Sequence, residues 1–305
     1  MDKINHQETI VNLRGLMKDY IIKSDLKSLV LGISGGIDSA LVAVLVKPVC
    51  DELGIPLIGR SITIGTNSEE EQERARQIGN LFCTSFEEVN LSDLFQDINS
   101  NLGVDEDDDD VDNNSRAWKI RLGNIKARMR MMYLYNLASI NKGLVLSTDN
   151  MTELLLGFWT LHGDVGDYGL IQQLWKTEVY DMSAWLCENE LDTKRKSDAL
   201  MSCVTGDATD GLGITSTDLD QILPDWKNRH NSTRTGYTEV DGILINYLEM
   251  VDKLLNNRFL SVQETLEISK NVLEIKETPV IQRHINSQFK RENPYNEDRD
   301  NFIVY

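Results

Sequence analysis

The sequence has 305 residues, of which 31 are Lys or Arg and 49 are Asp or Glu, so its formal net charge is −18. Hydrophobic residues make up 41% and charged residues 26%, a composition typical of a globular protein with a substantial core. The negative charge argues against a surface for nucleic acid or anionic lipid, because both require a basic face.

The first 27 residues predict an amphipathic helix, because Ile10, Leu13, Met17 and Ile21 recur at helical spacing. They contain no long apolar run and no small-residue cleavage site, so we expect no secretory signal. Apolar stretches such as Leu41–Val46 are too short to span a membrane. The four cysteines are widely scattered and form no CxxC pair, so we expect them to be buried, reduced thiols. We therefore expect a cytoplasmic protein with no membrane partner.

A strand, a glycine turn and a buried helix follow one another from residue 28. Ser28–Ile33 is a short run rich in β-forming residues, and the helix that begins at Ile37 is apolar nearly all round. A second strand at Leu57–Ile64 precedes a helix that Ser68 caps and that runs to about Leu81. This alternation predicts the α/β class, with a Rossmann-like, doubly wound, mostly parallel sheet flanked by helices.

The acidic run Asp105–Asp112 has no helical or strand period and lacks the glycine of a calcium loop, so we expect a solvated loop. A long helix is predicted from Ser115 to about Asn141, then a buried strand at Gly143–Ser147 and an irregular lid or binding loop at Lys194–Pro224. Further helices are expected at Asn150–Phe158, Thr177–Glu190, Val240–Leu255 and Ser261–Val272. No repeat or composition break divides the chain, so we expect a single domain over residues 1–305 with a helical C-terminal part.

The turn Gly32–Ser39 joins the first strand to the buried helix and is suited to bind phosphate. Its glycines let backbone N–H groups converge on an anion, and the helix N-terminus adds a favourable dipole. Ser34 and Ser39 can donate hydrogen bonds to the same phosphate, whereas Asp38 would repel it and so suggests a bridging Mg²⁺. A tight strand-to-helix turn without a ligand is the alternative. The turn has neither the GKS or GKT of a Walker A loop nor GxGxxG.

Three later segments carry further polar residues. Gly123–Arg130 is the densest positive cluster of an acidic chain, although a solvated helix face is the alternative. Glu153 follows the third strand at its C-terminal end, where open α/β sheets bind ligands, and it can complete a Mg²⁺ site with Asp38. Gly157–Asp167 combines glycines with aromatic residues that can stack on a heterocycle or pack in the core. Lys176 comes just before a helix, where it can meet phosphate.

The SGGxDS loop at residues 34–39 resembles that of the ATP-pyrophosphatase group, which includes NAD synthetase, GMP synthetase, asparagine synthetase and tRNA-modifying enzymes. In chain order, GxSGGxDS, GNxxARxR, TDxxE, GFxTxxGD and LxKTxV together resemble NAD synthetase, closely from Ser28 to Tyr180. The resemblance continues more loosely through Ala208–Gly213, similar to the family's PTDGL loop, to Phe289–Pro294, similar to its HKRxxP tail.

The resemblance implies an ATP-dependent ligase that forms a C–N bond. The nicotinate carboxylate of deamido-NAD would attack the α-phosphate of ATP, giving an NAD-adenylate and pyrophosphate, and ammonia would then displace AMP to give NAD. By the same resemblance, Asp38 and Glu153 would hold Mg²⁺, and Asp38, Lys176 and Asp164 would be catalytic. ATP would be bound by Gly32, Ile33, Ser34, Gly35, Gly36, Ile37, Asp38, Ser39, Arg60, Thr148, Lys176 and Thr209. Deamido-NAD would be bound by Arg128, Asp167, Phe289 and Lys290.

Three positions depart from the family pattern. Leu161 stands where the family's FTKYGD has lysine, Phe289 replaces the histidine of the HK pair, and Asp167 lies one residue out of register with GDGGAD. We expect no glutamine amidotransferase or nitrilase-type domain, so free ammonia would be the nitrogen source. The family is usually homodimeric, which implies a homodimer here.

Two alternatives remain open. An ATP pyrophosphatase that acts on another acceptor, such as tRNA or a purine nucleotide, would keep the glycine loop, although the net charge of −18 argues against tRNA. A catalytically weakened protein that binds ATP or deamido-NAD would explain Leu161 and Phe289. Turnover distinguishes them, because a sensor would bind both ligands without releasing AMP.

Overall fold

A computed structural model of the chain describes residues 4–65, 68–102, 115–206, 214–257 and 259–293. Its centre is one parallel sheet in the strand order β3-β2-β1-β4, with Leu29 of β1 opposite Leu57 of β2 and Leu144 of β4. The strands are β1 (Ser28–Gly32), β2 (Leu57–Thr63), β3 (Ser85–Asn90) and β4 (Gly143–Val145). This order confirms the predicted doubly wound α/β class.

Helices cover both faces of the sheet, and alternate residues of β1 point to opposite faces. Leu29 and Leu31 belong to the larger apolar cluster, whereas Val30 belongs to the smaller one. The larger cluster includes residues of α1 (His6–Lys23), α2 (Ile37–Leu53), α3 (Glu69–Phe82), α7 (Lys176–Asn189) and α8 (Lys194–Thr205). The smaller one includes residues of α4 (Ser92–Asn101) and α5 (Arg116–Ile140).

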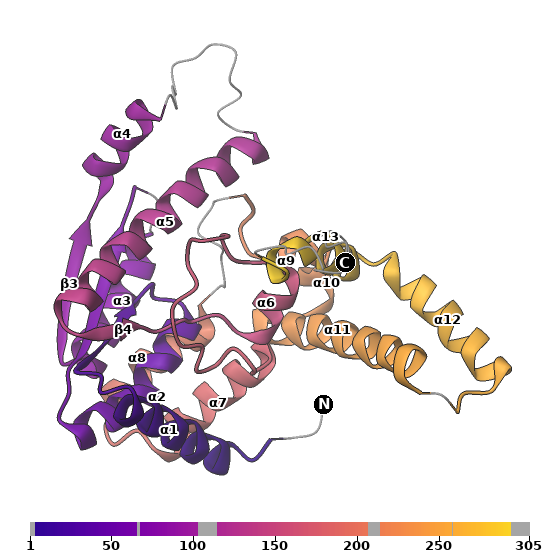
Figure 1. Cartoon of the computed structure of the whole chain (residues 1–305), viewed down its shortest axis with the longest axis horizontal. Coiled ribbons are helices and arrows are strands. Elements are labelled where there is room, and N and C mark those ends of the chain that lie inside the picture. The colour runs from indigo at the N-terminus through magenta and orange to yellow at the C-terminus, as the bar shows by residue number, and fades with distance from the viewer. Residues whose placement is uncertain (1–3, 66–67, 103–114, 207–213, 258, 294–305) are drawn as a thin grey trace, which may run out of the picture.

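The C-terminal part of the described chain is helical, as expected, and α11 extends away from the sheet with α12 packed beside it (Figure 1). Its helices are α9 (Leu219–Ile222), α10 (Trp226–Arg229), α11 (Thr233–Asn256), α12 (Val262–Lys276), α13 (Pro279–Asn286) and α14 (Gln288–Arg291). The short helix α6 (Met151–Leu156) follows β4. Among the described residues, no helix combines the length and apolar character that a membrane span needs.

Strand β3 and helix α8 are among the elements that differ from the sequence-based prediction. The edge strand β3 was not predicted, because only Phe86 and Val89 are partly buried and the rest of SFEEVN is exposed. The stretch Lys194–Pro224, predicted as irregular, contains the twelve-residue helix α8. Ala199, Leu200 and Cys203 bury one face of α8 against the larger cluster, so tertiary packing outweighs its polar composition. The acidic run Asp105–Asp112 lies outside the described residues.

Candidate functional site

The glycine turn lies at the C-terminal end of β1 and borders a cavity of about 270 Å³. Gly35 has φ +85°, and a Cβ there would lie 2.2 Å from the backbone oxygen of Glu71 on α3. The hydroxyls of Ser34 and Ser39 are 3.2 Å apart, and Ser34 Oγ accepts a hydrogen bond from the Gly36 N–H. The turn is therefore held in shape at the N-terminus of α2, where an anion is favoured.

Lys176 is the most buried charged side chain at this site, with 1% of its surface exposed. Its Nζ lies 2.5 Å from Asp38 Oδ2 and 2.7 Å from Glu153 Oε1, and Asn150 donates a hydrogen bond to Asp38 Oδ1. Burial favours a neutral lysine, but the two carboxylates outweigh it and raise the pKa of Lys176. Burial and the charge of Asp38 raise the pKa of Glu153. The site thus holds one ammonium between two carboxylates.

The described residues contain no group of three or more His, Cys, Asp and Glu side chains arranged to hold a metal ion. The carboxylates of Asp38 and Glu153 nevertheless converge on one point, where the Lys176 ammonium lies between them. Two carboxylates are enough for a Mg²⁺ that also binds phosphates of a ligand.

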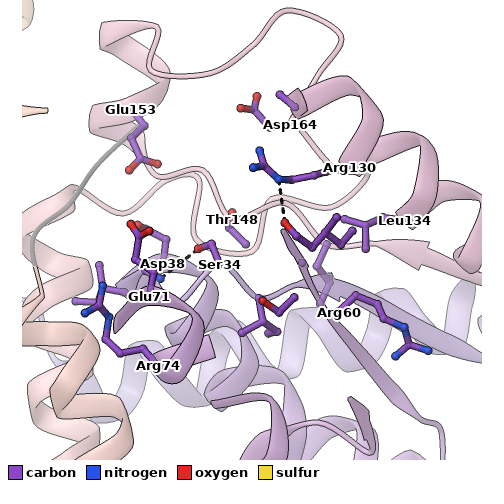
Figure 2. A pocket seen from close by; sticks show the side chains of 18 of the residues that line it. Ser34, Asp38, Arg60, Glu71, Arg74, Arg130, Leu134, Thr148, Glu153 and Asp164 are labelled. Carbon is purple, nitrogen blue, oxygen red and sulfur yellow. Dashed lines mark hydrogen bonds between the residues drawn. The ribbon is translucent and has the colours of Figure 1, made fainter. Parts of the chain in front are cut away.

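The remaining predicted ATP-binding residues are placed differently from one another. Thr148 lines the same cavity as the glycine turn. Arg60 also lines it, but its guanidinium donates to the Gly59 carbonyl and pairs with Glu87 of β3 at 3.2 Å. Figure 2 shows the Arg60 side chain directed away from Asp38 and Ser34. Thr209 lies outside the described residues.

A second cavity, of about 510 Å³, adjoins the first and contains three of the four predicted deamido-NAD residues. Arg128 donates a hydrogen bond to the Leu161 carbonyl, and Lys290 Nζ donates to the carbonyls of Gly157 and Trp159. Phe289 is 61% exposed. Arg128 and Lys290 are therefore tied to the backbone of the loop that follows α6.

Asp164 and Asp167, three residues apart, have different surroundings. Asp164 lines both cavities and accepts a hydrogen bond from the Thr160 N–H, and burial raises its pKa. Asp167 lines neither cavity, because its carboxylate accepts hydrogen bonds from the Val145 N–H and the Tyr135 hydroxyl. In this chain Asp167 therefore fastens β4 to α5.

Three residues in or beside the site were not among the predicted site residues. Arg74 on α3 lines the first cavity and donates a hydrogen bond to the Gly35 carbonyl. Asp149 is buried beside Ser147, and burial raises its pKa well above the ordinary value. Arg130 lines both cavities and was mentioned only as part of a basic cluster. Arg74 lies outside every motif of the site, so no local signal marked it.

A buried carboxylate on α11 supports the two helices that carry Glu153 and Lys176. Asp241 accepts hydrogen bonds from the Thr152 hydroxyl at 2.6 Å and from the Thr177 N–H and hydroxyl at 2.9 and 2.7 Å. Thr152 in turn accepts the Lys176 N–H. Asp241 therefore joins the first turns of α6 and α7, although nothing in the sequence motifs pointed to it.

The buried Asp241 carboxyl should make the free energy of unfolding depend on pH. Burial outweighs the three hydrogen bonds and raises the pKa of Asp241 from 3.8 to about 6. Because the folded protein keeps this proton to higher pH than the unfolded chain, the contribution of Asp241 to stability is full below pH 4 and is lost as the pH rises through 6. Between pH 4 and 7, the free energy of unfolding should fall by about 2 kcal/mol more in the wild type than in Asp241→Asn.

Urea unfolding of the two proteins at several pH values in this range measures the effect. Asp252→Asn, at an exposed position of the same helix, is the matched control and should follow the wild type. A difference between wild type and Asp241→Asn that stays constant with pH would contradict the assignment.

Comparison with known proteins finds one family model, described as NAD synthase, that matches residues 9–241. A relative from Methanosarcina mazei, named NH(3)-dependent NAD(+) synthetase, is 34% identical over 228 residues, which are 73% of this chain and 82% of the relative. Among solved structures, the NH3-dependent NAD synthetase of Campylobacter jejuni has a TM-score of 0.62 and 21% identity, covering 97% of this chain and 100% of its own. The NMN synthetase of Francisella tularensis has a TM-score of 0.65 and 19% identity, with the same coverage. Both structures support the fold.

Proposed function

The chain belongs to the NAD synthase family, and from this premise we propose how its residues carry out the ATP-dependent amidation of deamido-NAD to NAD with ammonia. The observation that carries the assignment of roles is the ammonium of Lys176, held between Asp38 and Glu153 beside a preformed glycine turn. The second cavity, which is rich in cations, adjoins the first, so two anionic substrates can meet where the two cavities join.

The reaction takes place in two steps in this proposal. An oxygen of the nicotinate carboxylate forms a bond to the α-phosphorus of ATP, and the bond to pyrophosphate breaks with its electron pair leaving on pyrophosphate. The nitrogen of ammonia then forms a bond to the acyl carbon of the NAD-adenylate, and AMP leaves with the electrons of the C–O bond. The nitrogen loses a proton, and we assign the acceptance of this proton to Asp164, which lines both cavities.

The residues of the glycine turn have a defined part in the first step. The backbone N–H groups at the start of α2 and the hydroxyls of Ser34 and Ser39 bind the phosphates that become pyrophosphate. Lys176 approaches from α7 and stabilises the charge that develops as the bond breaks. The site needs these local cations because the protein as a whole is strongly acidic.

The acidic pair fits the Mg²⁺ that the family resemblance implies. Asp38 and Glu153 would hold the ion, and the bound ion would neutralise charge on the phosphates of ATP. Arg128, Phe289 and Lys290 in the second cavity would bind deamido-NAD.

A homodimer and a cytoplasmic location are also part of this proposal. Several large apolar side chains of α5 are exposed, including Met132 and Ile140, and these would be covered by a second copy. Light scattering should give twice the mass of one chain, and a monomer at micromolar concentration would contradict the dimer.

Incubation with ATP, Mg²⁺, ammonium and deamido-NAD tests the function, with NAD and AMP followed by chromatography. We expect NAD and AMP in equal amounts, and glutamine in place of ammonium should give much less NAD. Nicotinate mononucleotide is the competing acceptor to include, because a neighbouring fold belongs to an NMN synthetase. Preference for the mononucleotide would overturn the dinucleotide assignment. Binding of ATP and deamido-NAD without AMP release would favour a sensor.

A further inference from the structure

Arg130 stands where the two cavities meet. Ala127, Arg130 and Asp164 are the described residues that line both cavities, and Arg130 is the cation among them. Ala127 and Arg130 are one turn apart on α5, so this face of the helix forms the boundary. Figure 2 shows the Arg130 guanidinium pointing into the first cavity, on the side of Asp164.

Most of the hydrogen-bonding capacity of Arg130 is unused within the described part of the chain. Its Nε–H donates to the Ile62 carbonyl at 3.3 Å, which holds the side chain against the end of β2. No carboxylate of the described residues lies within ion-pairing distance of the guanidinium. Burial lowers the pKa of Arg130, while the charges of Asp164 and Glu71 oppose that effect. A partly buried guanidinium with unused N–H groups is suited to bind an anion.

The other cations near the site have different positions. Lys176 and Arg74 line only the first cavity, and Arg128 and Lys290 only the second. Lys176 is held by two carboxylates. Arg130 differs from these four cations, because it lines both cavities and can reach an anion in either of them.

We infer that Arg130 is a further catalytic residue, whose guanidinium binds the nicotinate carboxylate and the α-phosphate of ATP together as the adenylate forms. This inference rests on the proposed function. Two anions must come into contact in that step, and a planar guanidinium can bind carboxylate and phosphate oxygens with separate N–H groups. Because the guanidinium is partly buried, its charge offsets their repulsion more strongly than it would in bulk water. The step transfers the adenylyl group to the carboxylate oxygen, with the electron pair leaving on pyrophosphate.

Exchange of labelled pyrophosphate into ATP, measured with deamido-NAD and without ammonia, isolates adenylate formation. For Arg130→Gln we expect the exchange rate to fall by about 100-fold or more, the effect of removing one preorganised donor. The dissociation constant for ATP should stay within about threefold of the wild-type value, because the glycine turn and Lys176 are unchanged. Arg121→Gln, at an exposed position of the same helix outside both cavities, is the matched control and should exchange normally.

The variants also separate catalysis from a structural role. A purely structural Arg130 would lower the melting temperature and weaken ATP binding along with exchange, which would overturn the inference. If Arg130→Gln does not fold, Arg130→Lys decides the question, because lysine keeps the positive charge but lacks the planar pair of N–H donors of the guanidinium. We expect the exchange rate of Arg130→Lys to fall about tenfold. Exchange at the wild-type rate would overturn the inference. Absence of exchange in the wild type would contradict the proposed function itself, and this inference with it. Normal exchange in both the wild type and Arg130→Gln would contradict the inference alone.

Discussion

Replacing Lys176 with methionine is expected to lower NAD formation by about 100-fold or more and the free energy of unfolding by about 3–5 kcal/mol. The lysine is fully buried, with Asp38 and Glu153 on either side of its ammonium. Methionine fills much of the same space but removes the positive charge. Two partly buried carboxylates would then face each other without a partner, and this loss, rather than a cavity, causes the instability.

Urea unfolding and the chromatographic assay measure the two effects separately. Lys18→Met is the matched control, because Lys18 pairs with Glu52 on the surface, where an ion pair contributes at most about 1 kcal/mol. Wild-type activity of Lys176→Met would contradict the assignment of Lys176 to the phosphates. Unchanged stability would show that the ammonium does not balance the two carboxylates.

Replacing Gly35 with alanine is expected to destabilise the protein by about 2–5 kcal/mol and to abolish ATP binding. Gly35 has φ +85°, which costs a residue with a Cβ about 1–2 kcal/mol. The added Cβ would also lie 2.2 Å from the Glu71 oxygen and 3.2 Å from the Ala75 nitrogen. Because these are backbone atoms of α3, the glycine turn itself must move, and its N–H groups would no longer converge on phosphate.

Gly54→Ala separates the strain of a positive φ from the clash of the added Cβ with α3. Gly54 follows α2 with φ +66°, yet a Cβ there would meet no atom within 4 Å. Its substitution should therefore cost only the conformational strain of about 1–2 kcal/mol and leave ATP binding unchanged. Calorimetric titration of ATP into both variants measures their affinity for ATP. If Gly35→Ala kept the wild-type affinity, the turn would tolerate a shift of its backbone.

Some parts of the site were predictable because their residues are close in sequence. The strand, glycine turn and helix from Ser28 to Leu53 form one βα unit, and its apolar pattern and glycines specify the turn locally. Thr148 and Glu153 follow β4, and the carboxyl ends of parallel strands meet at one edge of the sheet. Their place beside Asp38 therefore follows from the class of fold.

Other parts depended on how distant elements pack. The edge strand β3 has a polar sequence, and it is defined by its pairing with β2 rather than by its own pattern. Arg60 lines the predicted cavity, but Glu87 on that strand pairs with its guanidinium.

The sequence by itself determined the α/β class, the glycine turn between β1 and α2 and the family of the chain, because each depends on short-range patterns or on several motifs in order. Only the tertiary structure decided that Asp241 joins α6 to α7 through residues 89 and 64 positions away, and that Arg130 lies at the boundary of two cavities. Such contacts form when helices pack in a particular register, and no local spacing encodes which buried polar groups will meet.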